Sequence, residues 1–405
     1  MLSHSPTLHS TPGHYILCRS TTVNPPVSIK IPLRKPQLLP QIVKHIQITP
    51  INTTTRKKKT SNLDIIRLMD TLNHPIPLDI YSSFLRECTL HSDSIEALQL
   101  HNGLIRHKDL RFDSPLIHRL LYMLVSCGQL DIARNLFDKM PLRKDILSWA
   151  IVIIGYLDCS KHEEGINLFI KMLLYHNVCD VICKFPNWGI LLIGILEACL
   201  QSLNLGLGKQ LHGLMLKLGA TNDFSLSFSL MDFYGKLGYL KDANFVFNQV
   251  GDHNTDIWTV KIVNTCKLGC FDEVIEDFKE MGRAGIRMNG VTFSSVLRAC
   301  GGPGWYGGNC GKEVHAMAIK LGLESDALVK RGLIDMYGKC GMVMDAKRVF
   351  ELNTNKKNAV YWNALLMAYV RNGMHIDAIK FLYLMEASRV NINEKLINHV
   401  RIACS

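Results

Sequence analysis

The sequence predicts an all-α fold of stacked helix pairs, and three observations carry this prediction. Short strings recur along the chain, the recurring segments carry apolar residues at helical spacing, and no segment alternates apolar and polar residues as a strand does. With 405 residues, 47% hydrophobic and 20% charged, the chain has a globular composition but is long for one compact core. A repeat array or several domains are therefore expected.

Residues 1–60 differ from the rest of the chain in charge and composition. This leader holds nine basic residues, no acidic ones, and many serines, threonines and prolines. The remainder has 37 basic and 35 acidic residues, so most of the formal net charge of +11 belongs to the leader. A basic, hydroxylated, acid-free start without an apolar core is typical of an organelle transit peptide, with a disordered tail as the alternative.

The composition of the leader also indicates a destination. Its first residues are hydroxylated rather than rich in arginine, which favours the chloroplast, with the mitochondrion as the alternative. The run RKKK at residues 56–59 resembles a nuclear signal, but its place at the end of an acid-free leader favours the transit peptide. Residues 61–77 are expected to form a capping helix, and residues 78–405 the repeats.

The internal period is clearest in one string of eleven residues. GVTFSSVLRAC at 290–300 returns as GILLIGILEAC at 189–199, as LDIYSSFLREC at 78–88 and as EKLINHVRIAC at 394–404. The final cysteines are 111, 101 and 104 residues apart. Between these strings lie further recurring ones, namely GKQLH and GKEVH, LMDFYGKLG and LIDMYGKCG, and the tryptophans Trp149, Trp258 and Trp362.

Each recurring segment has the pattern of an amphipathic helix. Phe293, Val296, Leu297 and Cys300 stand at i, i+3, i+4 and i+7 and form one apolar stripe. Gly322 follows the next helical segment at the place where a helix-terminating glycine belongs. Helices of about 10–13 residues are marginal alone in water, so the array is expected to be stable only when neighbouring pairs stack.

Several patterns that suggest other functions are better explained structurally. No stretch reaches the roughly 18–20 apolar residues that a membrane span needs. The thirteen cysteines include no CxxC pair and are expected to be reduced and packed. The glycine-rich segment at 302–307 follows no strand, so we expect a loop rather than a dinucleotide site. His101, His212 and His315 recur at one repeat position, which favours packing or an interhelical hydrogen bond.

The recurring motifs resemble those of plant pentatricopeptide repeat proteins, in the subclass that alternates three repeat variants. The matching motifs are the Ser-Trp and Tyr-Trp-Asn-Ala-Leu-Leu starts, the Ala-Cys ends, Gly-Lys-x-x-His and Asp-Met-Tyr-Gly-Lys-Cys-Gly. The resemblance implies a right-handed superhelical solenoid of tandem helix-turn-helix repeats. The expected units are 78–113, 114–145, 146–188, 189–223, 224–254, 255–289, 290–326, 327–358, 359–393 and a truncated 394–405.

The resemblance also implies a function and a set of site residues. Family members bind single-stranded RNA with one nucleotide per repeat. The fifth and last residues of a unit choose the base, and the second packs against it. By this correspondence Thr259 with Asn289 specifies adenine, Asn363 with Asn393 a pyrimidine, cytosine first, and Ser294 with Asp326 guanine. Val360 and Val291 occupy base-packing positions, and the expected target is A-x-x-C read from 5′ to 3′.

Other positions depart from the family pattern. Ala150 stands where a polar fifth residue is expected, His118, Phe228 and Arg331 are also atypical, and Asp256 places an anion at a base-packing position. Many subclass members carry a zinc-dependent deaminase-like domain with an HxE and CxxC signature. That signature does not occur in this sequence. We therefore expect that the protein is not an enzyme and that it needs neither a metal nor a cofactor.

The expected partner is therefore single-stranded organellar RNA, joined by a deaminase acting in trans or another RNA-processing protein. The roles left open are recognition of an RNA-editing site and the processing or stabilisation of a transcript. A protein-interaction scaffold without RNA specificity is the alternative, which the near-neutral body and the atypical positions favour. A decayed relative with little activity is a third reading.

Overall fold

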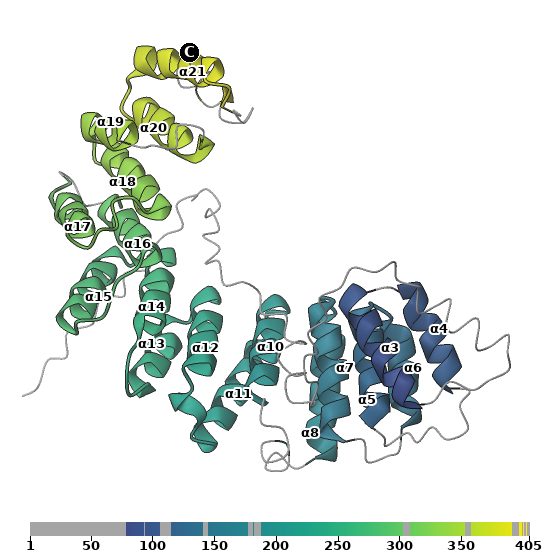
Figure 1. The fold of residues 1–405 in the computed structure, drawn as a ribbon. Helices are drawn as coiled ribbons and strands as arrows, with labels where there is room; N and C mark the ends of the chain where they lie inside the picture. Colours follow the sequence, from purple (N-terminus) through teal and green to yellow (C-terminus); the bar gives the residue numbers. More distant parts are fainter. Residues whose placement is uncertain are drawn as a thin grey trace, which may run out of the picture. The chain divides into compact units, whose positions relative to one another are not determined.

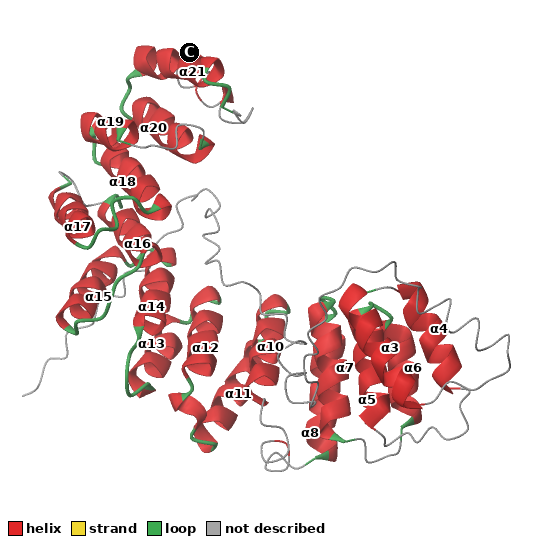
Figure 2. Cartoon of the chain, in the orientation of Figure 1, coloured by secondary structure: helices red, strands yellow, loops and turns green. Residues whose placement is uncertain are grey.

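The computed structural model describes most of the chain after the leader. The described residues are 78–92, 94–105, 115–140, 145–176, 181, 188–302, 308–352, 358–390, 397, 398, 400 and 402. The expected leader at 1–60 and capping helix at 61–77 lie outside them, as does most of the expected truncated unit at 394–405. All regular structure in the described part is helical, without a strand (Figure 2).

The helices of Leu78–Ala387 that the structure describes form nine consecutive pairs (Figure 1). The first helices of the pairs are α3 (Leu78–His91), α5 (Pro115–Ser126), α7 (Ile146–Asp158), α10 (Trp188–Gln201), α12 (Phe224–Lys236), α14 (Thr255–Lys267), α16 (Gly290–Cys300), α18 (Ala327–Lys339) and α20 (Ala359–Arg371). The second helices are α4 (Ser94–Ile105), α6 (Leu130–Lys139), α8 (His162–Tyr175), α11 (Leu205–Lys217), α13 (Leu240–Gln249), α15 (Phe271–Arg283), α17 (Asn309–Lys320), α19 (Val343–Glu351) and α21 (His375–Ala387). One short 3₁₀ helix, η1 (Ala220–Asn222), joins α11 to α12.

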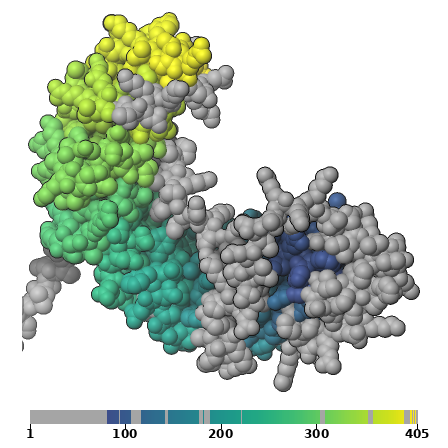
Figure 3. Space-filling view, in the orientation of Figure 1, coloured from purple at the N-terminus to yellow at the C-terminus, as the bar shows by residue number. Residues whose placement is uncertain are grey.

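Neighbouring pairs stack through their first helices. Each first helix contacts the next one along the chain, from α3 through to α20. Most second helices contact the first helix of their own pair and that of the following pair, as α15 contacts α14 and α16. From α12 to α21 the units present a continuous packed surface on the face that Figure 3 shows. The predicted all-α array of tandem helix pairs is confirmed.

The recurring tryptophans form the same contact in three interfaces. Trp149, Trp258 and Trp362 are each 4–5% exposed. Each meets, edge to face, a phenylalanine from the second helix of the preceding pair, with ring centroids 4.9, 4.8 and 4.9 Å apart. The three phenylalanines are Phe137, Phe247 and Phe350. An edge-to-face pair adds roughly 0.5–1.5 kcal/mol to the burial of the two rings, so this contact fixes how consecutive pairs join.

Two histidines at the recurring position bond between helices, as predicted. The Nδ1 atom of His212 lies 3.0 Å from the Tyr234 hydroxyl, and that of His315 lies 2.8 Å from the Tyr337 hydroxyl. Both histidines stand on second helices and both tyrosines on the first helix that follows. His101 differs, because its Nδ1 atom lies 3.2 Å from the side-chain oxygen of the adjacent Asn102.

Helix ends follow the predicted signals. Gly322 after α17 has φ +69°, and Gly341 after α18 has φ +79°, a conformation that glycine adopts without steric cost. In both turns the next amide donates back to the last helical turn, from Leu323 to the Ala318 carbonyl and from Met342 to the Tyr337 carbonyl, each at 2.9 Å. This pattern is the Schellman motif.

Two glycines allow first helices to approach closely. A Cβ atom on Gly338 of α18 would lie 2.5 Å from the Ala368 Cβ of α20 and 3.1 Å from its Cα. Gly235 of α12 holds the equivalent place against the Asn264 side chain of α14. Both glycines belong to the recurring Tyr-Gly-Lys string, so the string encodes a backbone approach between neighbouring units.

Replacing Gly338 with alanine is expected to lower the free energy of unfolding by about 1–3 kcal/mol, because the added methyl overlaps the Ala368 Cβ atom of α20 and crowds its Cα atom. Gly213 of α11 is the matched control, since a Cβ there meets nothing within 4 Å. Gly213→Ala should leave stability unchanged or raise it by up to about 1 kcal/mol, through helix propensity alone. Urea denaturation measures both, and equal effects of the two variants would contradict the close approach.

Candidate functional site

The last residue of a unit caps the first helix of the next unit. Asn289 precedes α16, and its Oδ1 atom accepts a hydrogen bond from the Thr292 amide at 2.9 Å. Asp326 precedes α18, and its Oδ1 atom accepts from the amides of Leu328 and Val329 at 2.8 and 3.1 Å. Asp145, Asp223, Asn254 and Asn358 cap α7, α12, α14 and α20 in the same way. Each predicted base-specifying last residue in the described chain is thus also a helix cap.

The first predicted pair is brought together by the structure. The Asn289 Nδ2 atom lies 3.5 Å from the Thr259 Oγ1 atom of α14. Thr292, which is fully buried, places its hydroxyl 2.9 Å from Thr259 Oγ1 and 3.0 Å from Asn289 Oδ1. Because the Oδ1 atom accepts from both the amide and the hydroxyl of Thr292, the Nδ2 atom of Asn289 is turned toward Thr259. The orientation of the amide is therefore set by Thr292.

Thr259 itself is less accessible than the prediction implied. Only 5% of the residue is exposed, and its hydroxyl donates to the Thr255 carbonyl at 2.6 Å. Asn289 is half-buried and forms the more accessible member of the pair. Sequence reasoning missed Thr292, whose contribution depends on α16 packing beside α14.

The second predicted pair lies on neighbouring helices without a direct bond. Ser294 of α16 is half-buried and faces Gly332 of α18, where a Cβ atom would lie 3.6 Å from the Ser294 Cα. Asp326 packs against the start of α16, because a Cβ on Gly290 would lie 2.5 Å from its Oδ1 atom. No hydrogen bond joins Ser294 to Asp326 in the described structure.

The third predicted pair is described only in part. Asn363 is half-buried in α20, and its inaccessible Oδ1 atom has no hydrogen-bond partner among the described residues. Asn393 lies outside the described residues, so the pairing stays a prediction. Of the two base-packing residues, Val360 is 42% exposed at the start of α20, and Val291 is half-buried at the start of α16.

One atypical unit shows the same contact between its fifth and last residues. The His118 Nε2 atom of α5 lies 2.9 Å from the Asp145 Oδ2 atom, while the Ser148 hydroxyl and amide bond to the Oδ1 atom of the same carboxylate. Burial alone would raise the pKa of Asp145, but the bonds from His118 and Ser148 outweigh it and lower that pKa. The other atypical fifth residues differ, since Ala150 is buried, Phe228 half-buried and Arg331 exposed.

The last turns of the first helices from α12 onward carry a row of basic residues that we call the basic stripe. The stripe consists of Lys236, Lys267, Arg298, Lys339 and Arg371. The earlier helices α5, α7 and α10 have no basic residue in their last turns. The near-neutral charge of the body concealed this stripe, although its period of one per unit was visible in the sequence.

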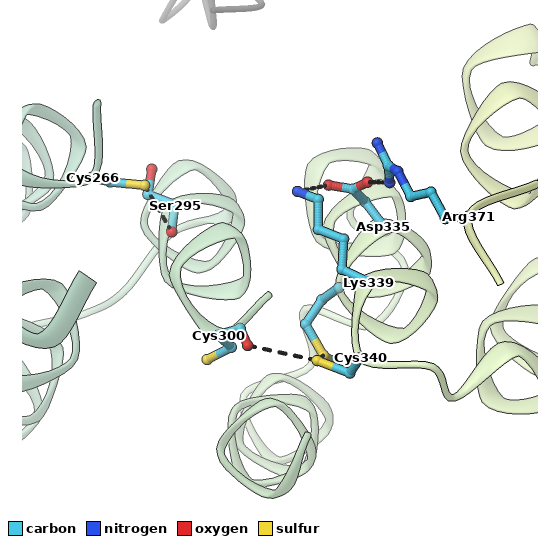
Figure 4. A network of polar contacts seen from close by, with 8 residues as sticks. Cys266, Ser295, Cys300, Asp335, Lys339, Cys340 and Arg371 are labelled. Carbon is cyan, nitrogen blue, oxygen red and sulfur yellow. Dashed lines mark hydrogen bonds and ion pairs between the residues drawn. The ribbon is translucent and has the colours of Figure 1, made fainter. Parts of the chain in front are cut away.

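Two aspartates neutralise part of the basic stripe. Asp335 accepts from Lys339 at 2.6 Å and, across to the next first helix, from Arg371 at 2.8 Å (Figure 4). Burial alone would raise the pKa of Asp335, but these two cations lower it. Asp232 pairs with Lys236 at 2.5 Å. Five basic residues thus face two carboxylates, so the stripe keeps an excess of positive charge.

Lys267 lies beside two other cations of the stripe and one carboxylate. Burial lowers the pKa of Lys267, and the neighbouring Lys236 and Arg298 lower it further, while Asp232 opposes them. A lysine whose ammonium is repelled by its neighbours gains from an added anion. The stripe is therefore suited to contact with a polyanion.

None of the described helices combines the length and the apolar character of a transmembrane span. The described side chains also include no group of three or more His, Cys, Asp or Glu residues arranged to hold a metal ion.

The fold and the recurring interfaces define a tandem helix-pair repeat protein, and comparison with known proteins gives its family. Three segments, 147–175, 332–352 and 360–390, match the family model described as PPR repeat. Pentatricopeptide repeat-containing protein At1g31790 of Arabidopsis thaliana is 42% identical over 367 residues, which cover 89% of this chain and 86% of that protein. The chain therefore belongs to the pentatricopeptide repeat family.

Further relatives match over part of their length. Two other Arabidopsis thaliana family members, At2g03380, mitochondrial, and At4g18520, chloroplastic, are each 30% identical over 85% and 80% of this chain. The chain spans about half the length of each of them, 48% and 50%. Among solved structures, the pentatricopeptide repeat protein PPR10 in complex with an 18-nt psaJ RNA element is similar at 16% identity and a TM-score of 0.41, over 85% of this chain and 61% of that one.

Two substitutions of Asn289 separate the role of its Oδ1 atom as a helix cap from the role of its Nδ2 atom, which lies near Thr259. Asn289→Ala should lower the free energy of unfolding by about 1 kcal/mol, because α16 loses its cap. Asn289→Asp should change stability by less than about 0.5 kcal/mol, since a carboxylate oxygen can still accept from Thr292 and a helix N-terminus favours negative charge. Urea denaturation compares the two, and a large loss in the aspartate variant would contradict the described cap.

Proposed function

We propose that this protein binds single-stranded RNA in a sequence-specific manner along the first helices of its repeats. Proteins built from such repeats read one base per repeat through two or three side chains. The observation that carries the proposal is the Thr259–Asn289 contact, which joins the fifth and last residues of one unit at 3.5 Å where α14 meets α16. A base lying over this junction would contact Asn289, the more accessible member of the pair, with the buried Thr259 hydroxyl behind it.

The basic stripe supports the same function through a different part of the ligand. Thr259 and Lys267 are eight residues apart on α14, which corresponds to about 12 Å along the helix. A strand that crosses the first helices in succession can therefore place bases at the N-terminal ends and phosphates toward the stripe. Phosphate contacts provide affinity and position, whereas base contacts provide sequence preference.

The finer assignments are carried over from the family. We propose adenine for the unit at 255–289 and a pyrimidine, cytosine first, for that at 359–393. The resemblance suggests guanine for the unit at 290–326, but Ser294 and Asp326 share no hydrogen bond in the described structure, so this position stays open in the expected target. Val360 supports the pyrimidine assignment because its exposed side chain offers an apolar surface to a base. Asp256, which is exposed at the equivalent place in the adenine unit, weakens contact there.

We propose that the protein acts in an organelle, with the chloroplast preferred over the mitochondrion. The leader composition supports this location, and the relatives carry both mitochondrial and chloroplastic names. In that setting the bound site would either be marked for editing by a deaminase acting in trans or be protected during transcript processing.

The test is selection of the full chain against a pool of random single-stranded RNA at moderate salt. We expect enrichment of A-x-x-C, and Asn289→Asp should move the first position from adenine to guanine by roughly tenfold, which corresponds to ~1.4 kcal/mol. Because Asn289→Asp is expected to keep the cap of α16 and the stability of the protein, a change in base preference would reflect the contact with the base.

Asn358→Asp provides the matched control. Asn358 caps α20 as Asn289 caps α16, but the fifth residue of its unit is the atypical Arg331. This variant should leave the preference for adenine at the first position unchanged. A pool that shows no enrichment for the wild-type chain would favour the protein-scaffold alternative.

A further inference from the structure

Three cysteines gather where the seventh helix pair turns. Cys300 ends α16 and Cys310 stands in the first turn of α17, with their Sγ atoms 3.4 Å apart. Cys340, just after α18, lies with its Sγ atom 3.6 Å from the Cys300 carbonyl oxygen (Figure 4). Two thiols at van der Waals distance need only small side-chain rotations to reach the ~2.05 Å of a disulfide bond.

The two members of the close pair differ in access. Cys300 is 1% exposed, whereas Cys310 is half-buried. A reagent in solution therefore reaches Cys310 first, and Cys300 becomes reachable mainly through Cys310. This order is what a pair consisting of an attacking and a resolving thiol requires.

The surroundings of Cys310 favour its thiolate. The α17 helix begins at Asn309, and Gly308 before it offers no side-chain cap to the free amides of the first turn. Free amides at a helix N-terminus stabilise a thiolate. The hydrogen bond from Cys300 lowers the pKa of Cys310 to about 7, and the charge of Lys279 also lowers it. The same bond, together with burial, raises the pKa of Cys300, so the shared proton stays on Cys300.

We propose that Cys300 and Cys310 form a thiol–disulfide exchange site that accepts a disulfide from solution as its oxidant. This inference does not depend on RNA binding. The resulting crosslink would join the end of α16 to the start of α17.

The proposed exchange has two steps that balance. The Cys310 thiolate attacks one sulfur of the oxidant disulfide, forms a mixed disulfide and expels the other sulfur as a thiolate, which takes a proton from water. Cys300 then gives up its proton to solvent and attacks the Cys310 sulfur, and the second half of the oxidant leaves as a thiol. The protein dithiol is oxidised to a disulfide, and one external disulfide is reduced to two thiols.

Other cysteines in the chain provide internal comparisons. Cys88 and Cys127 are 3.9 Å apart but both are buried, so an oxidant should reach them slowly. Cys159 is solvent-exposed, but its remaining contacts with the protein and the negative charge of Asp158 raise its pKa. Cys159 is thus a control for an accessible thiol whose thiolate is not stabilised. Cys88 and Cys127 are a control for two close thiols that solvent does not reach.

The test exposes the reduced full chain to oxidised glutathione, blocks the remaining thiols with N-ethylmaleimide, and maps the products by mass spectrometry without reduction. We expect the Cys300–Cys310 linked peptide to form before any other crosslink. At pH 7 Cys310 should react at least roughly tenfold faster than Cys159, and its rate should rise through about pH 7 as the thiol ionises.

Three variants separate the roles. Cys300→Ser should stop the reaction at a glutathione adduct on Cys310, Cys310→Ser should abolish early reaction, and Cys340→Ser should leave the wild-type pattern intact, with folding checked by circular dichroism. The proposal is overturned if wild-type Cys310 reacts no faster than Cys159, if its glutathione adduct persists without closing, or if the linked peptide pairs Cys310 with Cys340. Each of these outcomes is read from the wild-type chain and does not require a variant to fold.

Discussion

The contact between consecutive first helices is the interaction on which the rest of the molecule depends. Helices of nine to fourteen residues have little stability alone, so each pair persists only by burying its apolar stripe against its neighbours. The glycines of the Tyr-Gly-Lys strings let these helices approach, and the Phe–Trp contacts fix how successive pairs join. The line of polar residues at the helix starts is a product of this stacking.

One side chain serves both the fold and the proposed binding surface. Asn289 caps α16 through its Oδ1 atom, which leaves its Nδ2 atom directed toward Thr259, the fifth residue of its own unit. The requirement for a cap already selects asparagine and aspartate at these positions. Their presence in a sequence therefore does not distinguish a structural cap from a base contact. Under the proposed function the fifth residue of the unit makes this distinction, and Thr259 and Arg331 differ in size and charge at that position.

Local sequence signals made much of this fold predictable, whereas the contacts between units could not be predicted from the sequence. Helical spacing predicted the stripes, and glycine position predicted the turn at Gly322. The recurrence of His212 and His315 predicted packing or an interhelical hydrogen bond, and both form the bond. The burial of Thr259 by Thr292 and the Arg371–Asp335 pair join residues from different units, so no single segment reveals them. The thiol pair was hidden similarly, because cysteines that look packed in the sequence differ in access once α16 turns into α17.

We propose that RNA lies across the starts of the first helices, and photocrosslinking can locate the bound strand. RNA containing 4-thiouridine at positions flanking A-x-x-C would be bound to the full chain, irradiated, and the attached peptides identified by mass spectrometry. We expect the crosslinks to concentrate in peptides that contain the starts of α14, α16 and α20. Crosslinks confined to the second helices, such as α15, α17 and α21, would contradict this proposal.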